Sequence, residues 1–232
     1  MNYLRKSNSV IFPLIVINTV VFILEQLMPN LFSNFVLNTG MIFIQPWSII
    51  TSMFMHANFS HIFFNMYVLL MFGPLIEQRI GSKRFLGIYF LSGIVASLGF
   101  AFYHEIILNL SSSAVGASGA IMGIIGMVII LVPDLQVLFF FVLPMSMRTA
   151  GIIFALFDLF GVFYIPGIAN TAHLFGMATG LIYGWYLLKK KKTFQRVFSI
   201  KEHYKKKQGN SYQDSITVDD DKINDYLKYG RI

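Results

Sequence analysis

The sequence has no cysteine among its 232 residues, which excludes a disulfide framework and a thiolate nucleophile but leaves serine chemistry possible. It is also poor in charge, because only 12% of its residues are charged while 56% are hydrophobic. That apolar content exceeds the roughly 45–50% typical of a soluble domain. We therefore interpret the chain as a membrane protein.

Lysine and arginine are missing from three long stretches, between Lys6 and Arg79, between Arg84 and Arg148, and between Arg148 and Lys189. A helix that crosses a bilayer needs about 20 mostly apolar residues, so these stretches predict six crossing helices. Their ranges are approximately 10–28, 59–78, 85–107, 117–132, 148–165 and 170–188. The expected fold is an all-α bundle of six transmembrane helices, with a long outer loop between the first two.

Six crossings place both termini on one side of the membrane, together with every lysine and arginine. The positive-inside rule makes that side cytoplasmic. We expect a cytoplasmic N-terminus (1–9), a membrane domain (10–188) and a basic cytoplasmic tail (189–232) that is disordered or forms a short helix. The net charge of +7 then reflects topology and anionic lipid, not nucleic acid.

Reactive side chains occur near the outer ends of three predicted helices that all run from outside to inside. The second helix carries His61 and Asn65, the fourth begins at Ser118, and the sixth carries His173. At 1.5 Å per residue these positions share a similar depth. The topology therefore predicts one site on the outer side of the membrane.

Within this site, Ser118 is the candidate nucleophile and His173 its general base. Small residues at four-residue spacing, such as Gly176 and Gly180, allow close helix packing and share a face with His173. The glycines at 116 and 119 are expected to leave room for a substrate backbone. His61 and Asn65 lie four apart on one helical face and can donate to the same oxyanion.

A third catalytic residue is not evident, and we expect a Ser–His dyad. Glu77 and Asp134 lie at cytoplasmic helix ends, and Glu105 lies near the outer end of the third helix. Asp158 lies within the fifth helix and keeps a triad open, because intramembrane acids are commonly functional. The histidine spacing does not match a zinc protease, so we expect no metal and no cofactor.

Four motifs occur in one order along the membrane domain. They are His-x4-His-x3-Asn (His56, His61, Asn65), Glu-x-Arg-x-Gly (Glu77, Arg79, Gly81), Gly-x-Ser-Gly (Gly116–Gly119) and Ala-His-x-x-Gly-x-x-x-Gly (Ala172–Gly180). In these motifs the chain resembles the rhomboid family of intramembrane serine proteases, in its simple six-span bacterial form. Two positions depart from the family pattern, since Ser48 follows Trp47 in the outer loop and Met122 replaces a ring.

The resemblance implies that Ser118 is nucleophile, that His173 is base, and that the Ser118 N–H, His61 and Asn65 form an oxyanion hole supported by His56. It implies structural roles for Gly176, Gly180, Glu77 and Arg79. Substrates would be transmembrane helices that approach laterally between the second and fifth helices, and a bacterial inner membrane is the expected location. The sequence does not fix the oligomeric state.

Two rival functions remain at this point. A catalytically silent rhomboid-like protein would bind membrane helices without cutting them, although the retained Ser118 and His173 argue against it. A small transporter would be expected to show broken helices in paired repeats and charges along a path. Only Asp158 fits that pattern.

Overall fold

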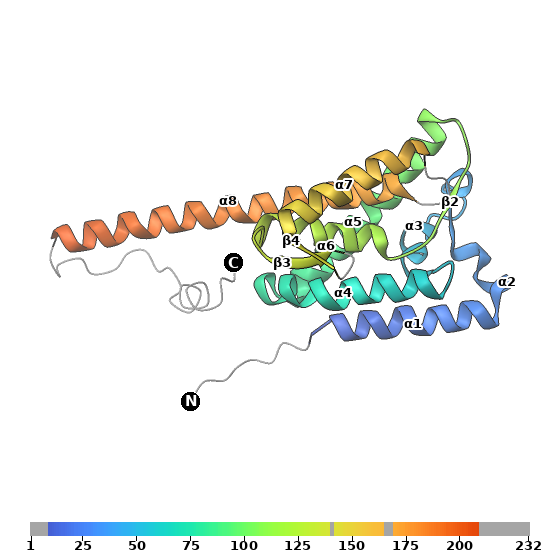
Figure 1. Cartoon of the computed structure of the whole chain (residues 1–232), viewed down its shortest axis with the longest axis horizontal. Coiled ribbons are helices and arrows are strands. Elements are labelled where there is room, and N and C mark those ends of the chain that lie inside the picture. Colours follow the sequence, from blue (N-terminus) through green and yellow to red (C-terminus); the bar gives the residue numbers. More distant parts are fainter. Residues whose placement is uncertain (1–8, 140–141, 165–168, 209–232) are drawn as a thin grey trace.

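A computed structural model of the chain describes residues 9–139, 142–164 and 169–208. Its long helices are α1 (Ile11–Leu27), α4 (Phe59–Ile80), α5 (Ser82–Phe102), α6 (Ser118–Leu131), α7 (Met147–Tyr164) and α8 (Asn170–Gln208) (Figure 1). Each starts within three residues of a predicted range, so the mostly helical fold is confirmed. Helix α8 continues past residue 188 to Gln208, whereas residues 1–8 and 209–232 of the predicted termini lie outside the described residues.

Three helices are long and apolar enough to cross a bilayer alone: α4, α7, and α5 with its π-helical continuation η4 (Tyr103–Ile107). Helix α1 qualifies only together with the segment Pro29–Phe35, from which it is bent by 120°. The described residues thus contain three or four candidate crossings, as befits a multi-pass membrane protein. The count of six crossings and the cytoplasmic side of the termini stay predictions.

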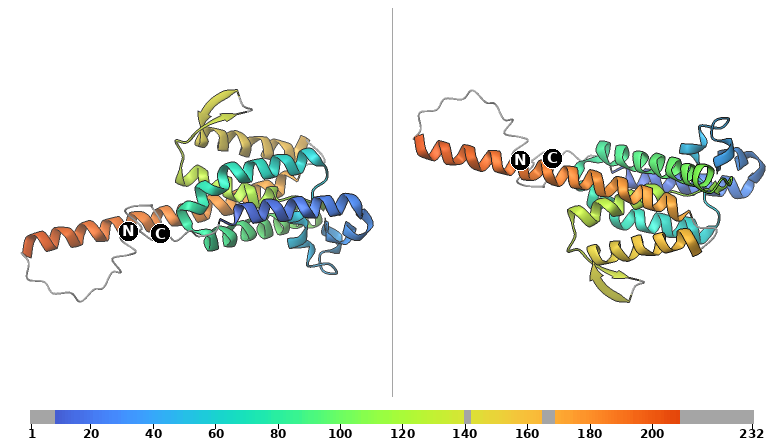
Figure 2. Two further views of the ribbon diagram at one scale, coloured as in Figure 1. Left: turned by 90° about the horizontal axis from the view of Figure 1, so that it is seen from below. Right: turned by 90° about the horizontal axis from the view of Figure 1, so that it is seen from above.

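Helix α6 is the centre of the bundle. It has only 14 residues, and ten in succession, Gly119 to Val128, are buried. A helix that is apolar on all sides packs within a core. Helices α5 and α8 lie against it (Figure 2). Gly119 faces Ala96 of α5, and Gly126 faces the Met177 carbonyl of α8.

Glycines set the distance between α6 and α8. A Cβ atom on Gly176 would collide with the carbonyl oxygen of Gly119, and one on Gly180 with that of Gly123. Small residues at such spacing allow helix backbones to touch in a membrane, where packing drives association. The two predicted structural glycines of α8 therefore lie at its closest approach to α6.

The other predicted structural pair, Glu77 and Arg79, lies near the end of α4. The Glu77 carboxylate accepts hydrogen bonds from the Val10 N–H (2.8 Å) and the Ser9 hydroxyl (2.6 Å). These bonds satisfy polar groups at the start of α1, where the Ser9 hydroxyl also accepts a hydrogen bond from the Ile11 N–H at 3.3 Å. The Arg79 side chain donates a hydrogen bond to the Leu75 carbonyl (2.9 Å), so this contact links two residues of α4.

The segment between α1 and α4 is a chain of short elements. They are α2 (Pro29–Phe32), η1 (Ser33–Phe35), β1 (Leu37–Asn38), η2 (Thr39–Met41), α3 (Ser48–Thr51) and η3 (Ser52–Phe54). Strand β1 pairs antiparallel with β2 (Ser113–Ala114), which ties this segment to the chain just before Ser118. A second antiparallel pair, β3 (Gln136–Phe139) and β4 (Leu143–Ser146), connects α6 to α7.

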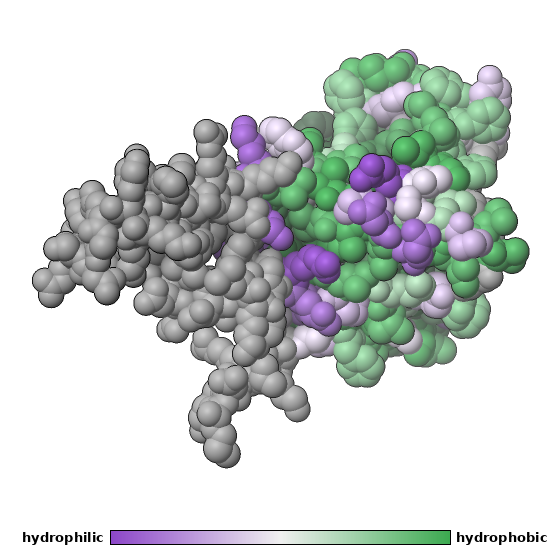
Figure 3. Space-filling model, turned by 60° about the vertical axis from the view of Figure 1, so that its left-hand side comes forward, coloured by the Kyte–Doolittle hydropathy of each residue, from purple (hydrophilic) through white to green (hydrophobic). Residues whose placement is uncertain are grey.

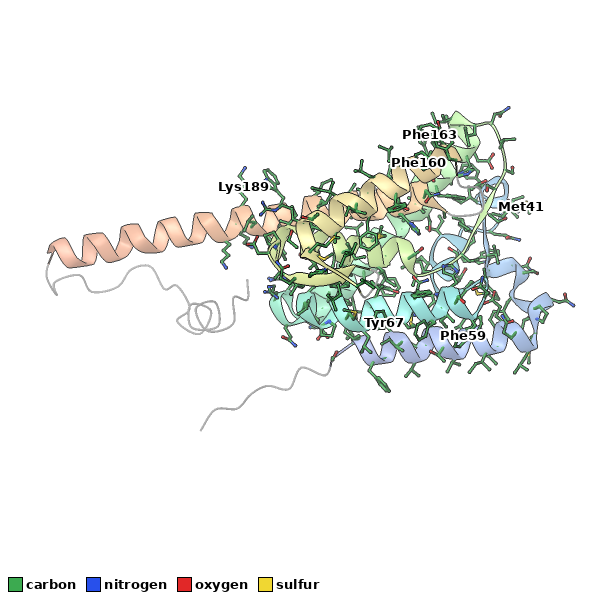
Figure 4. All side chains as sticks on the ribbon, in the orientation of Figure 1. Met41, Phe59, Tyr67, Phe160, Phe163 and Lys189 are labelled. Carbon is green, nitrogen blue, oxygen red and sulfur yellow. The ribbon has the colours of Figure 1, made fainter. Side chains whose placement is uncertain are left out.

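The surface of the bundle is largely apolar, as the hydrophobic face in Figure 3 shows. Phe12, Phe59 and Phe163 are each at least 70% exposed. Exposed apolar area on this scale suits lipid, not water. In Figure 4, Phe59 and Phe163 lie toward one end of the bundle, and Lys189 marks the opposite end, where α8 leaves it.

Candidate active site

Ser118 is the first residue of α6, where helix N–H groups are unpaired and the dipole favours negative charge. The turn before it depends on Gly116, which has a φ of +120° and donates its N–H to the Ser52 carbonyl (2.9 Å). A side chain at Gly116 would also meet the His61 ring, with Cβ 2.7 Å from Nε2. Only glycine permits both the turn and this approach.

His173 lies in the first turn of α8 and reaches Ser118. Its Nε2 is 2.9 Å from the Ser118 Oγ, within the range that proton transfer requires. The close contact between α6 and α8 brings the two residues together, as their sequence positions suggested. Both side chains face the same cavity.

The sequence favoured a Ser–His dyad and left Asp158 open as a third residue, and the structure places Asp158 against His173. Asp158 of α7 places its Oδ1 2.9 Å from the His173 Nδ1. The Asp158 side chain is only 9% exposed, and that of His173 is 19% exposed. Ser118, His173 and Asp158 therefore form one hydrogen-bonded chain across three helices.

Depth was a signal that could have placed Asp158 in the site. It lies six residues before the end of α7, and His173 lies three residues after the start of α8. Because consecutive antiparallel helices meet at their connection, these offsets put the two residues about 5 Å apart in depth at 1.5 Å per residue. The sequence does not show which face of α7 turns toward α8, because apolar residues cover a broad part of the helix surface.

A cavity of about 910 Å³ opens beside Ser118. Its polar wall includes His61, Asn65 and the Ser118–His173–Asp158 chain. Its apolar lining includes Phe64 and Val68 of α4 and Phe154 and Phe157 of α7. In the part of the chain that the structure describes, no cluster of three or more His, Cys, Asp or Glu side chains is arranged to hold a metal ion.

The two predicted oxyanion donors, His61 and Asn65, lie in the first two turns of α4 and line this cavity. The His61 N–H is capped by the Asn58 side chain at 2.9 Å, which fixes the start of the helix. Asn65 donates one amide hydrogen to the His61 carbonyl at 2.8 Å. Since an amide nitrogen carries two hydrogens, this bond occupies only one of them.

His56 lies behind His61 and is fully buried. The rings meet edge to face with centroids 5.2 Å apart. The His56 Nδ1 donates to the Phe54 carbonyl at 3.2 Å in its neutral tautomer, and its backbone N–H donates to the Glu25 carboxylate at 3.1 Å. His56 therefore links the loop before α4 to α1 and supports the His61 ring.

His56 also predicts a pH dependence of stability. Burial, with a smaller contribution from His61, lowers the pKa of His56 from 6.5 to about 4. The unfolded chain binds a proton below pH 6.5 that the folded protein excludes until about pH 4, so acidification removes up to about 3 kcal/mol of stability. Thermal unfolding in detergent should show the wild-type midpoint falling between pH 7 and 4.5, more steeply than that of His56→Gln. Equal slopes would contradict this account.

The structure also shows the surroundings of two glycines beside Ser118 and of the two residues that depart from the family pattern. A side chain at Gly116 would meet the His61 ring and one at Gly119 would meet Ala96, so both glycines permit close packing, and room for a substrate backbone beside them stays a prediction. At the two departures from the family pattern, Ser48 is fully buried in α3, and Met122 is buried in α6 and lines the cavity.

Comparison with known proteins gives consistent matches. The rhomboid domain profile matches residues 44–190. The chain is 34% identical to the putative rhomboid protease YdcA of Bacillus subtilis over 146 residues, 62% of this chain and 69% of that protein. It is 33% identical to mitochondrial Rhomboid protein 1 of Saccharomyces cerevisiae (61% and 42% covered) and 42% identical to Rhomboid-like protease 1 of Toxoplasma gondii (35% and 27%). The matches thus cover less than half of the yeast and Toxoplasma proteins.

Proposed function

This chain belongs to the rhomboid family, and we propose that it is an intramembrane serine endopeptidase that cuts transmembrane helices of other proteins. The observation that carries the proposal is the 2.9 Å hydrogen bond between the His173 Nε2 and the Ser118 Oγ. A hydroxyl within reach of an unprotonated ring nitrogen is the arrangement that nucleophilic acyl transfer needs. A silent helix-binding protein would have no use for it.

In the proposed reaction, the Ser118 Oγ attacks the scissile carbonyl carbon as its proton passes to the His173 Nε2. The new oxyanion lies at the start of α6, where the Ser118 N–H, His61 and Asn65 donate hydrogen bonds to it. His173 then gives its proton to the leaving amine. Water, deprotonated by the same nitrogen, releases the acyl group from Ser118.

The walls of the cavity favour a membrane-embedded substrate. Residues of α4 and α7 contribute apolar side chains to it, and Ser118 and His173 belong to its polar lining. A helix that unwinds beside Ser118 would keep apolar side chains against these walls while its backbone reaches the nucleophile. We place the access route between α4 and α7, and the protein in a bacterial inner membrane with the bilayer and transmembrane proteins as its partners.

Covalent labelling tests this proposal without knowledge of the natural substrate. The full chain, purified in dodecyl maltoside, is treated with a fluorescent fluorophosphonate, which reacts with an activated serine. We expect labelling of the wild-type protein, located at Ser118 by peptide mass spectrometry. Ser118→Ala should abolish it. An unlabelled wild type that also cuts none of several single-span reporters would overturn the proposal in favour of a silent helix-binding protein.

A further inference from the structure

Asp158 is a buried acid beside the site that the proposed Ser–His reaction does not use. It lies in the middle of an apolar helix, where a charged group is costly unless another group compensates it. Its carboxylate meets the His173 Nδ1 at 2.9 Å, on the side of the ring opposite Ser118. We propose that Asp158 is a positioning residue that completes a Ser118–His173–Asp158 triad, an inference that rests on the proposed function.

The hydrogen bond fixes the tautomer of His173. A carboxylate only accepts hydrogen bonds, so the Nδ1 beside it must carry the hydrogen. The Nε2 of a neutral ring is then unprotonated and faces the Ser118 hydroxyl as an acceptor. Asp158 thereby selects the form of His173 that can take the serine proton.

The same carboxylate offsets the charge that the reaction creates. When the Ser118 proton moves to Nε2, the ring becomes an imidazolium in a site of low polarity. An unpaired buried cation is strongly disfavoured, whereas one beside a hydrogen-bonded carboxylate is stabilised. The proton travels only between the serine, the histidine and the leaving amine, and Asp158 takes no part in its transfer.

Packing of α7 holds the carboxylate in place. The buried face of this helix includes Gly151, Asp158 and Gly161. Gly151 lies against the Ile129 side chain of α6, and Gly161 lies against the Asn170 side chain of α8. Because glycines on either side of Asp158 bring α7 close to its neighbours, the aspartate reaches His173 from a fixed backbone.

A purely structural role is the alternative, since the bond also joins α7 to α8. The two roles differ in what Asp158→Asn does. An amide of the same shape keeps the contact between the helices, but it lacks the charge and can donate to Nδ1, which favours the wrong tautomer. A positioning role predicts a large loss of rate in a folded protein, and a structural role predicts loss of folding.

The test compares fluorophosphonate labelling rates and thermal unfolding midpoints for the full chain in dodecyl maltoside. Asp158→Asn should label at least about 100-fold more slowly than wild type, with an unfolding midpoint close to that of wild type. If Asp158→Asn does not fold, Asp158→Ala is the second variant, and its labelling rate should fall by as much. Glu105→Gln is the matched control, because Glu105 bonds to Thr39 and not to His173, and its labelling rate should be unchanged.

Each outcome decides the proposal. A folded Asp158 variant that labels within about threefold of the wild-type rate would overturn the triad and leave the Ser–His reaction intact. Failure of both variants to fold would assign Asp158 a structural role instead. An inactive and unlabelled wild type would overturn the proposed function, and the triad with it.

Discussion

Ser118→Ala and His173→Ala are each expected to lower kcat for cleavage of a single-span reporter by at least about 10⁴-fold, and the double variant no further. The two residues share one proton in one step, so removing either leaves the other without a role. Residual activity would come from binding and from the oxyanion donors, which neither substitution touches. The measurement is the initial cleavage rate in phosphatidylethanolamine–phosphatidylglycerol liposomes.

A matched serine variant shows whether the loss is specific. Ser97 lies in α5, donates its hydroxyl to the Ile49 carbonyl at 3.1 Å, and does not line the cavity of about 910 Å³ beside Ser118. Ser97→Ala should keep kcat within about fivefold of wild type, since a single hydrogen bond is worth about 1 kcal/mol. If the losses of Ser118→Ala and His173→Ala multiply in the double variant, the residues act independently and the proposed mechanism is wrong.

The helical fold was largely predictable, because long apolar stretches separated by basic residues are a strong signal in a membrane protein. The number of membrane crossings was harder to predict from the sequence. Helix α6 needs only 14 residues because protein surrounds it, and α1 turns by 120° at Pro29 instead of ending in a plain loop. The two-residue strands β1 and β2 are too short to leave an alternating pattern.

The site was predictable where motif and depth agreed, and incomplete where geometry depended on helix rotation. Ser118 and His173 were identified because glycines at four-residue spacing imply contact between their helices. Asp158 was noticed as an intramembrane acid but not assigned, because nothing in the sequence fixes which face α7 turns toward α8. The sequence also does not reveal that a side chain at Gly116 would meet His61 and one at Gly119 would meet Ala96, because both contacts depend on how the helices pack.

The second large effect is expected from Gly180, at the contact between α6 and α8. Gly180→Ala should lower the free energy of unfolding by about 3 kcal/mol or more. Its Cβ would meet the carbonyl oxygen, carbonyl carbon and Cα of Gly123, and backbone atoms cannot move aside as a flexible side chain can. The helices would have to separate along the seam that also holds His173 against Ser118, so activity should fall together with stability.

Gly87 of α5 provides the matched control for this prediction. A Cβ atom there would have no neighbouring atom within 4 Å, so Gly87→Ala adds the same methyl group to a membrane helix without a collision. It should leave stability unchanged or raise it by up to about 1 kcal/mol, because alanine favours the helix over glycine. Unfolding of both variants in mixed dodecyl maltoside and dodecyl sulfate micelles measures the difference. Similar unfolding curves for the two would show that α6 and α8 are not held at the backbone contact described above.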